Sequence, residues 1–368
     1  MDSALSAVAE VETLRLDVML ERIARARATL GSRLLILCHH YQVDEVFQFA
    51  DAAGDSFKLA RVAAECKDAE FVVFCGVHFM AESADILTDP DQKVVLPDLA
   101  AGCSMADMAN LDQVECAWEA LTEGTRDDLI PVTYMNSSAA IKAFCGRHGG
   151  VVCTSSNAEK VLEWAWLRKR RVLFLPDQHL GRNVAHSMGV SLDDMGLWDP
   201  HALPEENFAE GCDRARIILW AGHCSVHTKF LPQHVDAVRE KIPGVKVISH
   251  PECTFEVIQK SDDWGSTEKI RKTIGASPSG SKWAIGTEFN LVGRLAREYP
   301  DKTIVSLSGV SCLCSTMFRI DPAHLMSSLE NLVKSEPPVK SEPLNLVSVD
   351  DETARDAKVA LERMLSLG

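Results

Sequence analysis

The stretch Val94–Met108, VVLPDLAAGCSMADM, contains the pattern on which the fold prediction rests. Val94, Val95 and Leu96 are typical of the end of a short buried strand, and Gly102 and Cys103 follow it. Glycine has no side chain, so a glycine before a cysteine at a strand exit lets the backbone turn sharply and lets another atom approach the thiol.

The same pattern occurs twice more. Ile217–Trp220 precedes Gly222 and Cys224, and Ile304–Leu307 precedes Gly309, Cys312 and Cys314. A single free cysteine is usually just a small buried apolar residue. Three cysteines at equivalent points are different, since soft thiolates select iron–sulfur clusters or zinc. We therefore expect one shared iron–sulfur cluster, bound by Cys103, Cys224 and either Cys312 or Cys314.

A cluster held by only three thiolates leaves one iron open, and such an iron can act as a Lewis acid on a hydroxyl or carboxylate. This favours elimination or addition of water over electron transfer. The 12 cysteines include no Cys-x-x-Cys, which disfavours a zinc ribbon or a ferredoxin-type loop. In a reducing compartment they are expected as thiols or metal ligands rather than disulfides.

The composition excludes several classes of protein. With 368 residues the chain is long enough for two or three domains. A net charge of −15 argues against nucleic-acid binding, which requires a basic face. No apolar run is long enough to span a membrane, and early acidic residues such as Glu10 and Glu12 are unlike a secretory or transit signal. We expect a cytoplasmic protein with small-molecule partners, without nucleic acid or membrane.

After an amphipathic helix over residues 11–30, closed by Gly31, predicted strands and helices alternate, which indicates α/β layers with parallel sheets. The strands group into three units: 34–38, 71–74 and 94–96; 130–133, 151–153, 172–175 and 217–220; 245–248, 283–285 and 304–307. We expect three similar α/β/α sandwich domains around a pseudo-threefold axis, with the active site at the centre. The predicted boundaries are 1–120, 121–232 and 233–334, followed by a linker and a C-terminal helix in 335–368.

Ligands of open parallel sheets bind beyond the carboxyl ends of the strands. The first strand of each unit ends in polar residues there, and four of them are acid–base candidates: His39, Tyr41, His250 and Glu252. Pro251 restrains the backbone beside Glu252. We expect His78, His179, His223 and His227 to be structural or supporting residues.

Hydroxyl side chains stand at the starts of predicted helices: Ser56, Ser155, Ser156 and Thr267. Ser156 and Glu159 fit a capping box, and N-capping is expected for at least one of the four. Helix N-termini also bind phosphate and carboxylate, so several around one pocket indicate a polyanionic substrate. No Walker loop or Rossmann glycine pattern is present, which argues against a nucleotide.

Over residues 34–325 the sequence resembles the quinolinate synthase family of NAD biosynthesis. The motifs that carry this resemblance are His39-His40-Tyr41-Gln42, Gly54-Asp55-Ser56, Gly102-Cys103-Ser104-Met105-Ala106-Asp107-Met108, Tyr134-Met135-Asn136-Ser137-Ser138-Ala139, Cys153-Thr154-Ser155-Ser156-Asn157-Ala158, Gly222-His223-Cys224-Ser225-Val226-His227, His250-Pro251-Glu252, Gly286-Thr287-Glu288 and Cys314-Ser315-Thr316-Met317.

The resemblance implies three homologous α/β domains around a 4Fe–4S cluster with one open iron. It implies condensation of iminosuccinate (iminoaspartate) with dihydroxyacetone phosphate to quinolinate, with release of phosphate and water, and a functional link to an enzyme that produces iminoaspartate. The implied cluster ligands are Cys103, Cys224 and Cys314. The implied substrate contacts are His39, Ser56, Tyr134, Asn136, Ser155, His250, Glu252 and Thr267, and Tyr41 and Glu252 would transfer protons.

Two features depart from the family pattern. His40 stands where the family often has Asn or Tyr, and since adjacent strand residues face opposite sides, His39 and His40 cannot both face inward. Cys312 is an additional thiol beside Cys314. The Cys-x-x-Met match favours Cys314 as the ligand, and a redox-sensitive pair of Cys312 with Cys314 is a further hypothesis.

Three other functions fit part of the pattern. A cluster-dependent hydro-lyase for another hydroxy acid would release no inorganic phosphate from dihydroxyacetone phosphate. A non-catalytic iron–sulfur sensor is disfavoured by the acidic charge and the lack of a nucleic-acid motif. A structural zinc protein would be colourless, whereas anaerobic iron–sulfur protein is brown.

Overall fold

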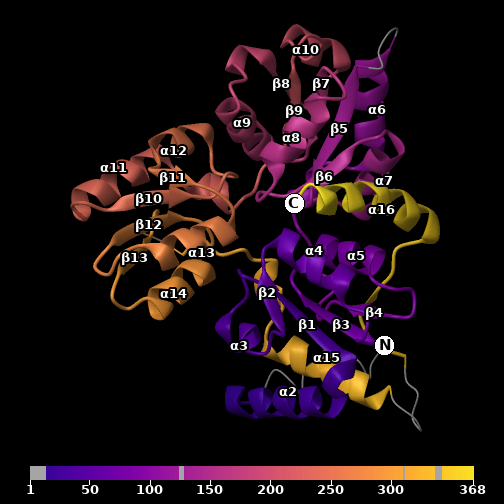
Figure 1. Ribbon diagram of the computed structural model, residues 1–368, viewed down its shortest axis with the longest axis vertical. Helices are drawn as coiled ribbons and strands as arrows, with labels where there is room; N and C mark the ends of the chain where they lie inside the picture. Colours follow the sequence, from indigo (N-terminus) through magenta and orange to yellow (C-terminus); the bar gives the residue numbers. More distant parts are fainter. Residues whose placement is uncertain (1–13, 124–127, 310, 336–341) are drawn as a thin grey trace. The chain divides into compact units, whose positions relative to one another are not determined.

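The computed structural model describes residues 14–123, 128–309, 311–335 and 342–368. This part of the chain is an α/β protein with three mostly parallel sheets flanked by helices (Figure 1). It divides into two compact units. Unit 1 comprises Met1–Gly102 and Cys314–Ser348, and unit 2 comprises Cys103–Leu313 and Val349–Gly368.

Unit 1 contains a sheet with strand order β14-β4-β3-β1-β2, in which β14 alone is antiparallel. Its strands are β1 (Leu34–His39), β2 (Ala52–Gly54), β3 (Phe71–Cys75), β4 (Lys93–Val95) and β14 (Leu346–Val347). Its helices are α2 (Leu16–Leu30), α3 (Asp44–Phe47), α4 (Ser56–Glu65), α5 (His78–Leu87) and α15 (Pro322–Lys334). Helices α4 and α5 lie on one face of the sheet, and α15, on which α2 packs, lies on the other (Figure 1). Every residue of β3 is buried, as expected of a strand covered on both faces.

The first sheet of unit 2 is entirely parallel, with strand order β6-β5-β7-β9-β8. Its strands are β5 (Leu129–Tyr134), β6 (Val151–Cys153), β7 (Arg171–Leu175), β8 (Met195–Trp198) and β9 (Ile217–Trp220). The helices of this part are α6 (Leu111–Thr122), α7 (Ala139–Arg147), α8 (Ala158–Trp166), α9 (Gln178–Ser187) and α10 (Pro204–Ala209).

The second sheet of unit 2 is also parallel, with strand order β11-β10-β12-β13. Its strands are β10 (Lys246–Ser249), β11 (Asp263–Trp264), β12 (Lys282–Gly286) and β13 (Thr303–Ser306). The helices that accompany it are α11 (Pro232–Lys241), α12 (Phe255–Lys260), α13 (Thr267–Ala276) and α14 (Phe289–Glu298).

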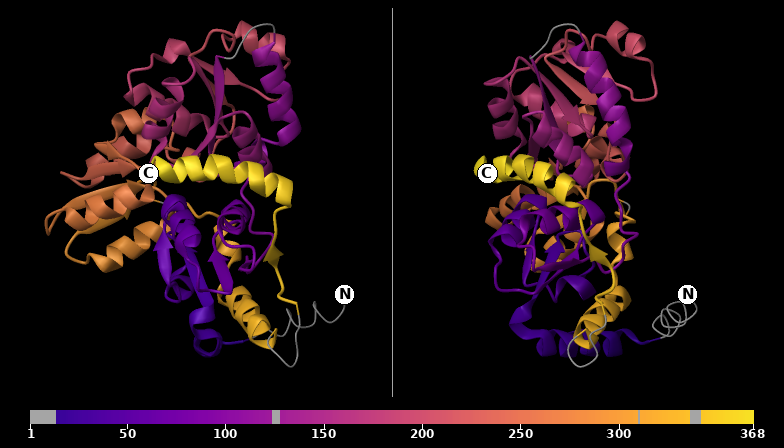
Figure 2. Two further views of the ribbon diagram at one scale, coloured as in Figure 1. Left: turned by 45° about the vertical axis from the view of Figure 1, so that its right-hand side comes forward. Right: turned by 90° about the vertical axis from the view of Figure 1, so that its right-hand side faces the viewer.

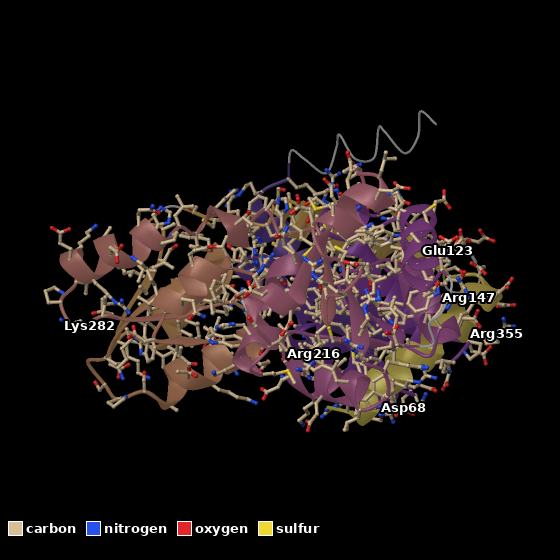
Figure 3. The ribbon with its side chains drawn as sticks, turned by 90° about the horizontal axis from the view of Figure 1, so that it is seen from above. Asp68, Glu123, Arg147, Arg216, Lys282 and Arg355 are labelled. Carbon is tan, nitrogen blue, oxygen red and sulfur yellow. The ribbon has the colours of Figure 1, made fainter. Side chains whose placement is uncertain are left out.

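The C-terminal helix α16 (Asp351–Ser366) packs on α7 and β6, and it is the yellow helix of Figure 2. Its fully buried face combines the small side chains of Ala357 and Ala360 with Leu361 and Met364. This allows the close approach to Gly146 of α7, where an added Cβ would lie 1.9 Å from the carbonyl oxygen of Asp356. Arg147 and Arg355, labelled in Figure 3, both pair with the Asp356 carboxylate.

The predicted alternation of strands and helices is confirmed. Each of the ten predicted strands is present, with ends within one residue of the prediction. Four strands were not predicted: β2, β8, β11 and β14. β2, β8 and β11 include Ala, Gly or Asp, which are depleted in strands, and β14 has only two residues.

Helix α2 begins at Leu16, and residues 11–13 of its predicted range lie outside the described residues. Gly31 ends this helix as predicted, with φ of 56° and its N–H bonded to the Arg27 carbonyl. Residues 336–341 of the predicted linker also lie outside the described residues. In the described segments, no helix is both long and apolar enough to cross a membrane.

The predicted N-caps are wrong. Helix α4 is capped by Asp55 and α13 by Ser266, so Ser56 and Thr267 are each the first residue of a helix instead. Helix α8 starts after Asn157, and the capping box of Ser156 with Glu159 is not formed. Where polar residues are adjacent, the point at which the backbone enters the helix decides which one caps it, and local sequence does not specify that point.

Candidate active site

The parallel registers of unit 2 bring its functional loops to the carboxyl edges of the two sheets. Tyr134 at the end of β5 pairs with Cys153 at the end of β6. Ser249 at the end of β10 pairs with Gly286 at the end of β12. In each of the two sheets, the residues that follow the paired strands therefore leave at the carboxyl edge, which is where parallel sheets bind ligands.

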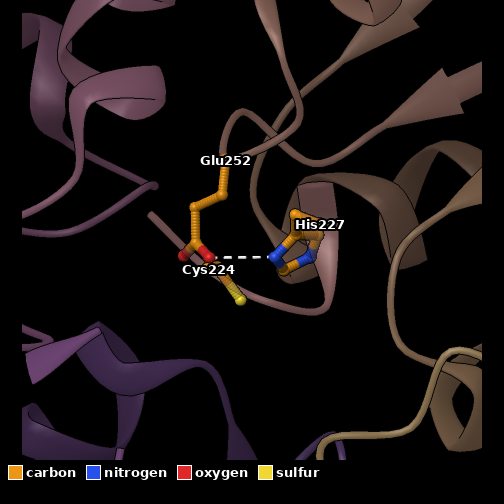
Figure 4. Close-up of side chains that lie close together, drawn as sticks. All are labelled: Cys224, His227 and Glu252. Carbon is orange, nitrogen blue, oxygen red and sulfur yellow. Dashed lines mark hydrogen bonds and ion pairs between the residues drawn. The ribbon is translucent and has the colours of Figure 1, made fainter. Parts of the chain in front are cut away.

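Four buried side chains from separate segments of unit 2 form one hydrogen-bonded chain. The Tyr134 hydroxyl donates to Glu252 Oε1 at 2.6 Å. Glu252 Oε2 lies 2.9 Å from His227 Nδ1 (Figure 4), and His227 Nε2 lies 3.3 Å from Thr287 Oγ1. The ionised carboxylate can only accept, so Nδ1 carries the proton of this contact, and in the tautomer with its single proton on Nδ1 the Nε2 atom can accept from the Thr287 hydroxyl. The hydroxyl–imidazole–carboxylate order is the one that activates a hydroxyl in hydrolases.

The charges of this chain follow from its surroundings. Burial would raise the pKa of Glu252, but His227, His250 and the hydrogen bonds from His227 and Tyr134 outweigh it and lower that pKa below its usual range. Burial lowers the pKa of His250 to about 3, and its ring stacks on His227 at 4.5 Å between centroids. At neutral pH the Glu252 carboxylate is therefore ionised and His250 is neutral.

Cys224 lies beside this chain. One ligand atom each from Cys224, His227 and Glu252 lies within 4.8 Å of the others (Figure 4). Burial and the Glu252 carboxylate raise the pKa of the Cys224 thiol, and the Cys103 side chain is near enough to raise it further. In such surroundings a thiolate is stable only when a positive charge lies beside it. A bound metal ion supplies that charge and deprotonates the thiol. The Cys224 and Cys103 thiols are thus compatible with thiolate ligation of a metal cluster.

The three predicted cluster cysteines share one local backbone structure. Each begins a short turn that leads into a 3₁₀ helix three residues later: Ala106–Met108 after Cys103, His227–Lys229 after Cys224, and Met317–Arg319 after Cys314. In each case the cysteine carbonyl accepts the N–H of the residue four positions on, at 3.0–3.1 Å. Cys103 and Cys224 belong to unit 2, whereas Cys314 belongs to unit 1.

Cys312 differs from Cys314 in its surroundings. Cys312 is fully buried in unit 2, its carbonyl accepts the Phe289 N–H, and its Sγ lies 3.4 Å from Ser308 Oγ. Cys314 is half-buried, with its Sγ 3.4 Å from Thr316 Oγ1. The shared turn therefore distinguishes two residues that spacing alone leaves open.

Two predicted substrate contacts of unit 2 have unused polar atoms. Asn136 Oδ1 and Thr267 Oγ1 are buried and have no hydrogen-bond partner among the described residues. Ser155 is half-buried after β6. Buried polar atoms are normally hydrogen-bonded, so unpartnered ones at strand exits are available to a ligand.

The remaining predicted residues belong to unit 1. His39 is buried, and its ring meets that of Tyr41 edge-on at 4.6 Å between centroids. His39 Nδ1 accepts the Tyr41 N–H at 3.2 Å. His40 instead stacks on Phe47 of α3, and Ser56 is the half-buried first residue of α4.

Three polar residues of the site were not singled out as catalytic from the sequence. Two of them, His227 and Thr287, complete the hydrogen-bonded chain that starts at Tyr134. Both occur in the motifs that carry the family resemblance, which was the available sequence signal. Asp177 follows β7 at the same edge. Its Oδ1 caps α9, and burial and the Glu252 carboxylate raise the pKa of Asp177 well above its usual value. The only sequence signal for Asp177 is its position after a buried strand.

A parallel α/β scaffold that brings a buried carboxylate–imidazole–hydroxyl chain beside the Cys224 thiol defines an α/β enzyme with its candidate catalytic groups at the strand ends. The family model described as "Quinolinate synthetase A protein" (NadA) matches residues 21–366.

Curated relatives that match most of the chain carry the same family name. A quinolinate synthase of Nocardioides sp. is 59% identical over 95% of this chain and 89% of its own length. That of Anoxybacillus flavithermus is 53% identical, covering 96% and 94%, and that of Bacillus subtilis is 54% identical, covering 94% and 92%. The chain belongs to the quinolinate synthase (NadA) family.

Proposed function

We propose that this chain condenses iminosuccinate with dihydroxyacetone phosphate to quinolinate, with release of phosphate and water, in the cytoplasm. Membership of the family supports the overall reaction. The observation that carries the proposal is the chain Tyr134–Glu252–His227–Thr287, which offers successive proton donors and acceptors beside Cys224. Condensation followed by dehydration requires several such transfers.

Cys103, Cys224 and Cys314 would hold a 4Fe–4S cluster, and their common turn supports this ligand set. When bound, the cluster would supply Lewis-acid chemistry at its non-cysteine iron, which favours loss of a hydroxyl group as water. A pseudo-threefold arrangement of three domains, 1–120, 121–232 and 233–334, would bring the three turns together.

The protein's own residues would bind the acidic substrates and move protons. Thr267 would donate its unpartnered hydroxyl, together with His39, Ser56, Ser155 and the neutral His250, to orient carboxylate and phosphate groups, and Asn136 Oδ1 would accept an N–H or hydroxyl of a substrate. The ionised Glu252 would remove a proton from a substrate carbon and return it through Tyr134 or His227. Tyr41 would act as a second proton carrier. An enzyme that produces iminoaspartate would be the functional partner.

The test is anaerobic turnover by iron-loaded protein with freshly generated iminosuccinate and dihydroxyacetone phosphate. We expect quinolinate and inorganic phosphate in equal amounts, and neither product from Cys224→Ala protein. Phosphate-free conversion of a hydroxy acid would instead indicate a hydro-lyase, and colourless, iron-free protein with zinc would indicate a structural metal site.

A further inference from the structure

The loop that carries Glu252 is short and mostly buried. His250, Pro251, Glu252 and Cys253 follow β10 and are all buried. Within the loop, the Cys253 N–H bonds to the His250 carbonyl at 2.9 Å. This leaves the carbonyls of Pro251 and Cys253, on either side of Glu252, to be satisfied from elsewhere, since buried carbonyls need donors.

Asn183 satisfies both carbonyls. It lies on α9 and is 2% exposed. Its Nδ2 donates to the Pro251 carbonyl and to the Cys253 carbonyl, each at 2.8 Å. Of the two polar atoms of the asparagine amide, only the nitrogen can serve two carbonyls, because the amide oxygen has no proton to give. Asn183 Oδ1 has no partner among the described residues, so the side chain acts purely as a double donor.

The position of helix α9, which carries Asn183, is set by its contacts with the neighbouring sheet and with the loop of Cys224. The Gln178 N–H at its start bonds to the Gly222 carbonyl at 3.0 Å, and Asp177 pairs with Gly222 as an isolated bridge. Gly181 lies so close to the sheet that an added Cβ would lie 2.6 Å from Leu219. One helix therefore contacts the loop of Cys224 at its N-terminus and the loop of Glu252 one turn and a half later.

We propose that Asn183 is a positioning residue for the reaction: its two N–H groups fix the backbone on both sides of Glu252 and so direct the carboxylate at Tyr134 and His227. This inference rests on the proposed role of Glu252. A carboxylate cannot replace the amide, since an Asp at this position would place acceptors against two carbonyls.

The experiment compares Asn183→Leu with Asn207→Leu in anaerobically iron-loaded protein. Asn207 is a matched control, because its buried Nδ2 also donates to two carbonyls, those of Asp199 and Leu203, outside the site. Both variants should bind wild-type amounts of iron and lose thermal stability. Only Asn183→Leu should lower kcat, by about 10- to 100-fold with KM changed less than about 3-fold, because a small displacement of a reacting group has a large effect on rate.

A double-mutant cycle with Glu252→Gln separates positioning from general structure. If Asn183 acts through Glu252, the double variant has the same kcat as Glu252→Gln alone. Multiplicative losses, or wild-type kcat in Asn183→Leu while Glu252→Gln is impaired, would overturn the inference. Wild-type kcat in Glu252→Gln would instead overturn the proposed role of Glu252. If Asn183→Leu does not fold, Asn183→Ser, which keeps one donor, takes its place in the cycle.

Discussion

The hydroxyl of Tyr134 donates to the carboxylate of Glu252 at 2.6 Å, across 118 residues of sequence. The two residues leave different sheets of unit 2, at the ends of β5 and β10. The bond helps keep Glu252 ionised in a buried site, because a hydrogen bond to the charged form lowers the pKa of a carboxyl group.

Removal of this bond tests its contribution. Tyr134→Phe should lower kcat by about 10-fold or more, since it withdraws a proton donor from the Glu252 carboxylate. Initial rates of quinolinate formation measure the effect. Tyr299→Phe is the control for loss of a phenol outside the site and should keep wild-type rates. Equal rates for the two variants would show that the hydroxyl of Tyr134 has no part in the reaction.

The chain from Glu252 to Thr287 predicts two graded losses. Glu252→Gln should reduce kcat about 100- to 10,000-fold, because the amide cannot accept a proton or orient His227. Thr287→Val keeps the shape of the side chain but removes the hydroxyl 3.3 Å from His227 Nε2. It should reduce kcat by a smaller factor. Full activity of Thr287→Val, with intact iron content, would exclude the hydroxyl from proton transfer.

The shared turn predicts which thiols bind iron. Cys103→Ala, Cys224→Ala and Cys314→Ala should each lose the cluster, because removal of one thiolate leaves too few ligands. Cys312→Ala should keep it, since Cys312 lacks the turn. Iron and sulfide per chain, measured anaerobically with the visible absorption, give the result. Loss of iron in Cys312→Ala together with retention in Cys314→Ala would reverse the assignment.

The contact between α7 and α16 predicts an effect on stability. Gly146→Ala should destabilise the protein by about 1–3 kcal/mol, because its Cβ would meet the backbone oxygen of Asp356, which can move only if the helix moves. In α14, Gly293→Ala would meet only the end of the flexible Arg297 side chain at 3.3 Å. That variant should be neutral or stabilised by up to about 1 kcal/mol through helix propensity. Denaturant unfolding of both variants provides the comparison.

The ion pair at the start of α15 predicts a dependence of stability on pH. The hydrogen bond to Asp321, at 2.9 Å, raises the pKa of His324. Burial would raise the pKa of Asp321, but its bonds to His324 lower it. The contribution of His324 is fully present below about pH 6.5 and is lost as pH rises through its raised pKa. That of Asp321 is present above about pH 4 and is lost as pH falls through its lowered pKa.

Both side chains of this pair are partly exposed, so the stabilisation between these limits should be below about 1 kcal/mol. The wild-type protein should have a higher free energy of unfolding than His324→Gln at about pH 5.5, and the two free energies should converge at about pH 8.5. A difference that grows with pH would contradict the assignment.

The sequence by itself determined the class of fold and the chemistry of the candidate residues. Long buried strands such as Leu34–His39 and Leu129–Tyr134 are visible as apolar runs, because a strand covered on both faces must be apolar along its length. The Gly–Cys repeats and the polar strand exits are equally local, so the residue types needed for thiolate binding and proton transfer could be recognised at their positions.

The tertiary structure alone decided which of these residues meet. The bond of Tyr134 to Glu252, the contact of His227 with Thr287 and the double donation by Asn183 depend on how helices and sheets pack, not on periodicity. The same holds for capping by Asp55 and Ser266, and for the turn that separates Cys314 from Cys312. A linear pattern specifies which face of an element is buried, whereas the partners on that face are set by long-range packing, which no local pattern encodes.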